Sequence, residues 1–293
     1  MLLKKYLSTL LPVAALLLVA SSAGWAVKYA APMTSAEWNL ELSPFECRMW
    51  QPIPVYGDAV FQYRAGEKQK FFLAPSRKAM KTGKALLVSS PPVWDGTRPS
   101  QKLGYVPVND SNRPVLLQAT QANQLLTELE KGMTPMFTRQ AWYSDTERVH
   151  IGLSSINFRK SYQEYRQCLA GLLPVNFDQI AKSRLRFDTA RWELTSDSIK
   201  RLDTIVHYVR ADPSVTGFYV DGHTDDMGRR LANLDLSKKR AEAVTRYLVT
   251  QGIDESLITT RYHGERYPMA RNKNAKSREL NRRVTIRLER SAL

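Results

Sequence analysis

The stretch from Val215 to Ala241 constrains this chain more than any other. A run of β-forming residues, Val215 to Val220, leads into a polar loop that carries Asp225, and we expect a helix to open at Ser237 as its N-cap. A strand-loop-helix unit returns the first turn of its helix to the strand end. Because Arg240 falls at the third helical position, we expect its guanidinium to face the Asp225 carboxylate.

A carboxylate that faces a guanidinium suits a zwitterionic ligand, because the acid accepts an ammonium and the guanidinium donates to a carboxylate. Asn233, in the middle of the loop, offers a donor and an acceptor to a peptide backbone, and the expected helix N-terminus adds partial positive charge. Thr224 and Leu236 are expected to shape the pocket. An alternative fits equally well: Asp225 caps its own loop and pairs with Arg240 on a solvated face.

Several motifs resemble the OmpA-like peptidoglycan-binding domain, and this resemblance extends from Arg186 to the end of the chain. The motifs, in order, are Arg186-Phe187-Asp188, Gly222-His223-Thr224-Asp225, Asn233, Leu236-Ser237-x-x-Arg240-Ala241, Gly264-Glu265-x-x-Pro268 and Asn281-Arg282-Arg283-Val284. In that family the acid and the arginine at the positions of Asp225 and Arg240 hold the diaminopimelate of the cell-wall peptide. The resemblance implies peptidoglycan as the ligand and favours the zwitterion site over the solvated pair.

Two further arginines, Arg282 and Arg283, open the predicted last strand. Because side chains alternate along a strand, the two point to opposite faces. One is expected to reach the ligand and the other to brace the Asp225 loop, and the residues do not say which. A solvated basic edge that discourages strand pairing is an equally good explanation for each of them.

Nothing in the sequence indicates an enzyme, a cofactor or a metal site. His223 and Asp225 have no third ligand at a suitable spacing. Hydrolysis of a glycan requires two carboxylates set across a bond, and the adjacent Asp225 and Asp226 point apart in an extended segment, with Asp226 expected to face water. We therefore expect a binding protein and rank a wall hydrolase last.

The N-terminus has the pattern of a secretory signal peptide. Lys4 and Lys5 precede an apolar run, Leu7 to Ala20, and small residues follow it. We expect residues 1–23 to be removed, with cleavage between Ala20 and Ala26. An uncleaved anchor is the alternative, and no cysteine marks this junction for lipidation. The predicted mature protein is soluble and periplasmic, without membrane insertion.

The formal net charge of +15 falls to +13 once Lys4 and Lys5 are removed. A basic protein of this kind favours an acidic partner, and nucleic acid is the usual one. Export argues against nucleic acid and favours the anionic cell wall and lipids. Many of these charges are also expected to be simple solvated surface.

The two cysteines, Cys47 and Cys168, are expected to form one disulfide, since exported chains with an even cysteine count favour bridges. The bridge would close a loop of about 120 residues and contribute about 4–5 kcal/mol in the chain-entropy model. Two buried free thiols are the alternative.

Residues 24–173 are predicted to form a β-rich, partner-binding domain, either an antiparallel sheet or a small barrel. Short β-forming runs alternate with prolines, and helices are expected from Thr120, as N-cap, to Gly132 and from Lys160 to Ala170. Four tryptophans lie between residues 26 and 173: Trp38, Trp50, Trp94 and Trp142. A β-rich core explains them better than a partner or glycan platform does.

Residues 174–293 are predicted to alternate strand, helix, strand, helix, strand, strand. The first helix has apolar residues at helical spacing from Ile199 to Val209, and the last strand alternates apolar and polar residues from Arg283 to Glu289. The result is an α/β sandwich with helices on one sheet face. The predicted class of the whole chain is α+β, and the OmpA-like resemblance implies the same second domain.

The complete architecture resembles the periplasmic proteins of the sodium-driven flagellar motor: a signal peptide, a β-rich domain with two distant cysteines, and a C-terminal wall-binding domain. This resemblance implies that the first domain binds MotX and the flagellar basal body, that the second binds peptidoglycan, and that together they stabilise the sodium-driven stator units. A general envelope protein that links the wall to the outer membrane is the second hypothesis, although abundant prolines disfavour an outer-membrane barrel.

Overall fold

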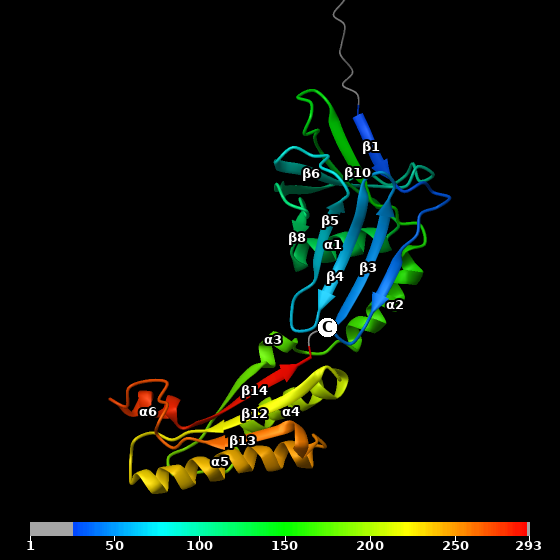
Figure 1. Cartoon of the computed structure of the whole chain (residues 1–293). Helices are drawn as coiled ribbons and strands as arrows, with labels where there is room; N and C mark the ends of the chain where they lie inside the picture. The colour runs from blue at the N-terminus through cyan, green and yellow to red at the C-terminus, as the bar shows by residue number, and fades with distance from the viewer. Residues whose placement is uncertain (1–25, 292–293) are drawn as a thin grey trace, which may run out of the picture.

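The computed structural model describes residues 26–291 and shows two lobes placed end to end. The expected signal peptide lies outside the described residues. In Figure 1 the first lobe runs from blue to green and the second from green to red. Separate clusters of buried apolar side chains fill the two lobes, and Leu172 packs against both. The predicted α+β class is confirmed.

Two five-stranded sheets build the first lobe. The first sheet contains, in order across it, β1 (Ala26–Ala30), β10 (Arg148–Gly152), β9 (Thr134–Gln140), β6 (Gly83–Ser90) and β7 (Gln101–Val108). The edge strand β1 pairs in parallel with β10, and the remaining pairs are antiparallel. The expectation of one sheet or a small barrel is thus replaced by two separate sheets.

The second sheet is antiparallel throughout. Its strands are β2 (Asn39–Leu42), β3 (Glu46–Ile53), β4 (Gly57–Arg64), β5 (Lys70–Pro75) and β8 (Leu116–Leu117). The sequence prediction missed β3, because Pro52 argues against a strand. Pro52 lies opposite Asp58, next to the turn of the β3-β4 hairpin, where a missing backbone donor is tolerated.

Helices α1 (Ala119–Glu130) and α2 (Phe158–Ala170) complete the first lobe. The residue at the N-cap of α1 is Gln118, which makes no side-chain cap, so the prediction of Thr120 was wrong by two residues. Leu125, Leu126 and Leu129 are buried, as their shared helical face predicts.

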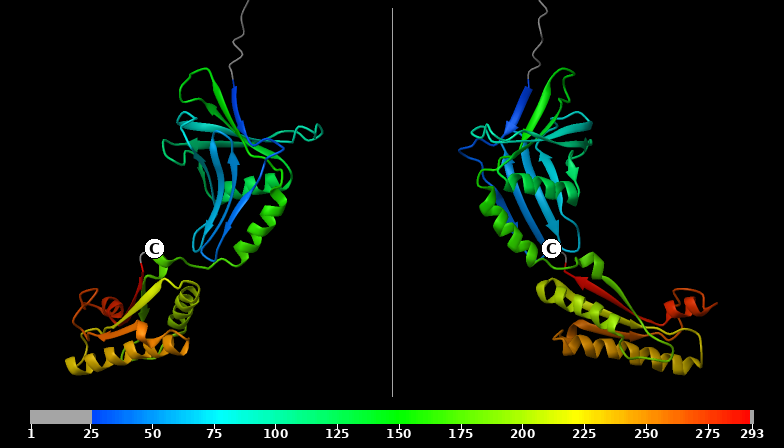
Figure 2. Two further views of the ribbon diagram at one scale, coloured as in Figure 1. Left: turned by 45° about the vertical axis from the view of Figure 1, so that its right-hand side comes forward. Right: turned by 180° about the vertical axis from the view of Figure 1, so that it is seen from behind.

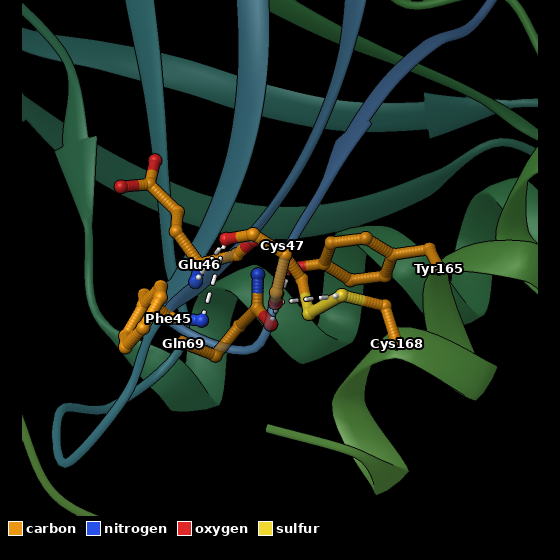
Figure 3. The surroundings of a disulfide bond; sticks show 7 residues. Phe45, Glu46, Cys47, Gln69, Tyr165 and Cys168 are labelled. Carbon is orange, nitrogen blue, oxygen red and sulfur yellow. Dashed lines mark hydrogen bonds between the residues drawn. A yellow bond between two sulfur atoms is a disulfide. The ribbon is translucent and has the colours of Figure 1, made fainter. Parts of the chain in front are cut away.

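The expected disulfide is present and joins Cys47 at the start of β3 to Cys168 in the last turn of α2. Figure 3 shows this bridge beside Tyr165, whose hydroxyl donates to Gln69 Oε1 at 2.9 Å. The two cysteines are 121 positions apart, and a loop of this size contributes about 4–5 kcal/mol by restricting the unfolded chain.

The prediction that the tryptophans fill the core is correct for only part of the set. Trp38 is buried and packs edge-on against Phe158 at a ring-centroid distance of 5.1 Å. Trp94 and Trp142 are 65% and 53% exposed, so both lie on the surface. Trp50 is half-buried beneath the guanidinium of Arg48.

The second lobe is a four-stranded sheet with its long helices packed on one face (Figure 2). Its strands, in order across the sheet, are β11 (Lys182–Arg186), β14 (Arg283–Arg290), β12 (Val215–Gly222) and β13 (Ile258–Tyr262). β14 is antiparallel to both neighbours, whereas β12 and β13 are parallel and therefore need a crossover helix.

The helices of the second lobe follow the predicted order. α4 (Ser196–Ala211) connects β11 to β12, and its N-cap Thr195 accepts a hydrogen bond from Ser198 N at 3.2 Å. α5 (Arg230–Thr250) connects β12 to β13. The structure adds short helices to the predicted set: α3 (Phe177–Ile180), the 3-10 turn η1 (Glu255–Leu257) and α6 (Ala275–Asn281).

A small set of contacts joins the two lobes beside the disulfide. Leu173 N donates to Pro44 O at 2.9 Å, and Gln179 Nε2 donates to Gly66 O at 2.9 Å. The rings of Phe45 and Tyr208 lie 5.5 Å apart across the junction. The first lobe thus contacts the second through the β2-β3 and β4-β5 turns.

Candidate ligand-binding site

The loop after β12 is held against helix α5 by a glycine. A Cβ atom on Gly222 would lie 2.1 Å from the backbone oxygen of Ser237, so only glycine allows this close approach. His223 N then donates to Arg283 O, and Thr224 N donates to Gly264 O, both at 2.9 Å. The loop that presents Asp225 is therefore fixed by three separate segments of the lobe.

Asp225 is buried, with 6% of its surface exposed, and its partner is Arg282. Arg282 Nη1 donates to Asp225 Oδ2 at 3.0 Å, and Met227 N donates to Oδ1 at 3.3 Å. An ion pair with this little exposure has lost most of its water, so it depends strongly on both partners.

Arg240 is fully buried and its guanidinium is bonded to backbone oxygens. Nε donates to Arg191 O at 2.8 Å, Nη1 to His223 O at 3.0 Å and Nη2 to Asp188 O at 2.9 Å. Burial lowers the pKa of Arg240 to about 10, while the nearby charge of Asp225 raises it, so the group stays charged at neutral pH.

The alternative expectation, in which Asp225 pairs directly with Arg240 on a solvated face, is therefore wrong. Within residues 26–291, no hydrogen bond or ion pair joins these two side chains. The physical reason is the segment from Asp188 to Arg191, which lies over the guanidinium and takes up two of its donors.

Helix α5 begins at Arg230, with Arg229 as its uncapped N-cap, rather than at Ser237. Ser237 lies inside the helix, where its hydroxyl donates to Leu234 O at 2.7 Å and accepts from Gly264 N at 3.0 Å. Arg240 is thus in the third helical turn, and the N-terminal amides of α5 do not lie beside it. The role expected for those amides at the Arg240 end of the site was wrong.

The two neighbouring arginines have different surroundings. Arg282 reaches Asp225 and also donates from Nε to Phe187 O at 3.2 Å. Arg283 is buried and donates from Nη2 to Tyr267 O at 3.0 Å, and burial lowers its pKa. Arg282 is therefore the one at the candidate ligand site, and Arg283 braces the adjoining loop.

Asn233 and Thr224 are both buried near the site. Asn233 lies in the first turn of α5, not in a loop, and its Nδ2 donates to Glu265 Oε2 at 2.7 Å. Thr224 Oγ1 has no hydrogen-bond partner within the described chain. Leu236 is half-buried, and Asp226 is exposed.

Sequence reasoning gave no role to Glu265 and Asn281, although both belong to the quoted motifs. Glu265 orients Asn233, as described above. Asn281 Oδ1 accepts from Met269 N at 2.7 Å and Ala270 N at 3.2 Å, and Nδ2 donates to Ala270 O at 2.7 Å. Asn281 therefore fixes the loop that precedes α6. The covering segment Asp188–Arg191 begins at the last residue of the first motif, and sequence reasoning gave that segment no contact with Arg240.

His223 is buried, and its ring stacks on His263 with centroids 5.0 Å apart. Burial, together with the charge of Arg283, lowers the pKa of His223 to about 3, so it is neutral at physiological pH. Burial alone would raise the pKa of Asp221, but hydrogen bonds from Arg261 and His263 outweigh burial and lower it. No cluster of three or more metal-ligating side chains occurs in the described part of the chain.

The class of protein to which each lobe belongs follows from matches to known families. Residues 186–282 match the OmpA family, and residues 29–174 match the MotY N-terminal domain. The second lobe is thus an OmpA-like domain of the peptidoglycan-binding class. Among helices within residues 26–291, none has the length and apolar composition required to span a bilayer.

A full-length relative narrows the class to one family. The chain is 33% identical over 273 residues to the sodium-type flagellar protein MotY of Vibrio parahaemolyticus, with 90% of this chain and 91% of the relative covered. The chain therefore belongs to the MotY family of flagellar motor proteins.

Other similar proteins match the second lobe. Outer membrane protein A of Bordetella avium is 38% identical over 102 residues, which cover 35% of this chain and 52% of that protein. The crystal structure of the peptidoglycan-associated lipoprotein from Burkholderia pseudomallei has a TM-score of 0.35 and 26% identity, and the match covers 36% of this chain and 89% of that one.

Proposed function

We propose that the second lobe binds the diaminopimelate of peptidoglycan peptide stems, and that this non-enzymatic chain thereby fastens flagellar motor components to the wall. The observation that carries the proposal is the buried Asp225-Arg282 pair with the charged Arg240 nearby. These groups sum to one net positive charge in a site shielded from water, where a ligand with matching charges gains most.

The ligand binds by exchange of ion-pair partners. Its ammonium takes the place of the Arg282 guanidinium on Asp225, and Arg282 turns to the ligand carboxylate, so that one ion pair is replaced by two. Arg240 holds the carbonyls of Asp188, Arg191 and His223 that wall the site. For Arg240 itself to contact the ligand, the Asp188–Arg191 segment has to lift.

The decisive comparison is between two adjacent acids. Asp225→Asn keeps the shape of the buried side chain but removes the charge that accepts the ammonium. We therefore expect its affinity for purified wall sacculi to fall about tenfold or more. Asp226→Asn, on the exposed neighbour, is the matched control and should bind like the parent protein. Equal binding by all three proteins would refute the proposal.

The identity of the ligand is tested with soluble peptide stems. A stem with lysine in place of diaminopimelate keeps the side-chain ammonium but lacks the adjoining carboxylate. We expect the diaminopimelate stem to compete with sacculi and the lysine stem to compete weakly, because only the former can engage both Asp225 and Arg282. Equal competition by the two stems would show that the contact between Arg282 and the ligand carboxylate does not contribute to binding.

We further propose that the first lobe binds MotX and the basal body in the periplasm. Its surface carries a cleft of about 300 Å³, the apolar cleft, whose lining includes Met33, Val93 and Trp94. These side chains are 59%, 93% and 65% exposed. Large exposed apolar groups gathered at a cleft support a protein-binding surface, and one aromatic anchor often carries much of such an interaction.

Trp94→Ser should therefore weaken co-purification with flagellar basal bodies, whereas Trp142→Ser, at an exposed tryptophan outside the cleft, should not. If both variants co-purify as well as the parent protein, the apolar cleft is not the docking surface. With the first lobe docked on the basal body, many copies of the second lobe contact the wall at once. Their weak individual contacts add up through effective concentration and hold the stator units in place.

A further inference from the structure

Among residues 26–291, the long helices α4 and α5 pack on one face of the second-lobe sheet and leave most of the other face uncovered; α6 reaches this other face at its Arg186 end, through Glu279. Along β11 the buried residues Ser183 and Leu185 alternate with the exposed Lys182, Arg184 and Arg186. The buried face packs against α4 and α5, because Leu185 belongs to the same apolar cluster as the inward residues of these helices. The exposed residues of β11 therefore share the opposite face, called here the open sheet face.

Residues from the other strands complete the open sheet face. Lys182 lies opposite Arg287 on β14, and Arg287 lies opposite Tyr219 on β12. In the next row Asp221 lies opposite Arg261 on β13. Directly paired residues point to the same side of a sheet. Basic side chains are thus present on three of the four strands.

The carboxylates on this face are already engaged. Asp221 accepts two hydrogen bonds from Arg261, at 2.7 and 3.0 Å, and Glu289 accepts one from the Tyr219 hydroxyl at 3.1 Å. Arg186 is paired with Glu279 at 3.1 Å.

Lys182, Arg184 and Arg287 have no acidic partner among residues 26–291. The guanidinium of Arg287 lies over the Tyr219 ring at 4.5 Å. The open sheet face therefore presents these three positive charges against one remaining negative charge, that of Glu289, because the Tyr219 hydroxyl is a neutral donor.

Protection of a sheet edge explains only part of this pattern. β11 is an edge strand, and basic side chains there discourage pairing with another chain. Arg287, however, lies on β14, which has a neighbour on each side. Its charge has no edge to protect.

The position of the face indicates its partner. β11 ends at Arg186, and the Phe187-Asp188 segment that adjoins both Arg282 and Arg240 follows directly. The row from Lys182 to Arg186 spans about 13 Å and leads away from the candidate ligand site. A polymer held at that site is thus brought alongside these charges.

We propose that the open sheet face is a second contact surface for peptidoglycan, which attracts the carboxylates of neighbouring peptide stems through Lys182, Arg184 and Arg287. This inference rests on the proposed function, since Asp225 supplies the specific contact. The open sheet face adds a nonspecific electrostatic attraction, which salt weakens. This attraction keeps the wall polymer close while one peptide stem leaves the Asp225 site and another binds.

The test uses the full chain and insoluble sacculi at 50 and 300 mM salt. The triple variant Lys182→Gln, Arg184→Gln, Arg287→Gln should bind about five- to tenfold more weakly at the lower salt, and like the parent protein at the higher salt, because exposed charges are screened there. The control triple Lys200→Gln, Lys238→Gln, Arg246→Gln removes the same charge from the helical side and should change binding less than twofold, roughly.

The outcomes separate this inference from the proposed function. Asp225→Asn should lose binding at both salt concentrations; if it does not, the proposed function fails whatever the triple variants do. Unchanged low-salt binding by the first triple, or an equal loss by the control triple, would overturn the second surface alone. If the first triple loses binding to anionic phospholipid vesicles but keeps binding to sacculi, the face contacts membrane and the wall assignment is wrong.

Discussion

The two lobes differ in what they bury. In the first lobe the rings of Trp38, Phe61, Phe71 and Phe137 form a connected apolar core. A disulfide also joins β3 to α2. The second lobe buries fewer aromatic rings and more polar or charged side chains, namely Arg240, Asp225, Arg283, His223 and Asn281. A buried charge costs free energy unless every partner is in place. The buried polar groups of the second lobe therefore lower its stability in exchange for a preformed polar site, whereas the core of the first lobe is mainly apolar.

The strongest way to separate the lobes is to remove the disulfide. Cys47→Ser with Cys168→Ser should destabilise the first lobe by about 4–5 kcal/mol, because the unfolded chain regains the freedom of a long loop. Hydrogen exchange on the full chain should show lost protection in the first lobe and unchanged protection in the second. Equal loss in both would mean that the lobes unfold as one unit.

A comparable change in the second lobe is Arg240→Met, which keeps the length of the side chain. The carbonyls of Asp188, Arg191 and His223 lose their donor, and we expect a cost of about 3 kcal/mol. Amide exchange in the second lobe measures it. Arg240→Lys, the control, keeps the charge and one bond and should cost less; a larger cost for lysine would contradict this account.

Acid should affect the second lobe more than the first. The pKa of His223 falls to about 3 on folding, so below its ordinary value near 6.5 the unfolded chain binds the extra proton and stability drops as the pH falls. Between pH 7 and pH 5 the loss is about 2 kcal/mol. Burial also lowers the pKa of the half-buried His150 in the first lobe, to a smaller extent.

Denaturant unfolding at the two pH values, monitored separately for each lobe, measures the effect. His223→Gln should remove most of the slope in the second lobe. A slope that persists in this variant would assign the acid sensitivity to other groups.

The smallest expected effect concerns the segment that covers Arg240. Ala190 has a φ of 56°, a left-handed conformation that costs about 1 kcal/mol for a residue with a Cβ. Ala190→Gly should stabilise the second lobe by less than about 1 kcal/mol, because glycine also gains freedom in the unfolded chain. Asn157→Gly in the first lobe, at a φ of 58°, is the control and should gain less, since asparagine tolerates this conformation. A decrease in stability for Ala190→Gly would contradict the strain argument.

Sequence predicted the elements whose signals are local. The order of strands and helices along the second lobe and the pairing of the two cysteines follow from periodicity and cysteine count. The start of α5 was missed because Leu236-Ser237 resembles a helix start, while the true N-cap, Arg229, makes no side-chain bond.

The partner of Arg240 was missed for a different reason. Asp188 and Arg191 lie about fifty positions upstream, and they act through backbone oxygens that any residue possesses. No residue type signals such a contact. The exposure of Trp94 and Trp142 was missed similarly, because hydrophobicity alone does not tell a core ring from a surface one.

The position of the disulfide has a mechanical consequence. The second lobe continues from α2 through Leu173, which is bonded to Pro44 just before β3, and Cys168 joins Cys47 at the same place. Tension that enters the first lobe along this connection reaches helix α2 and strand β3 together, because two sulfur atoms join them. Helix α2 then cannot be peeled from β3 by a pull on its C-terminal end, because the disulfide carries part of the load.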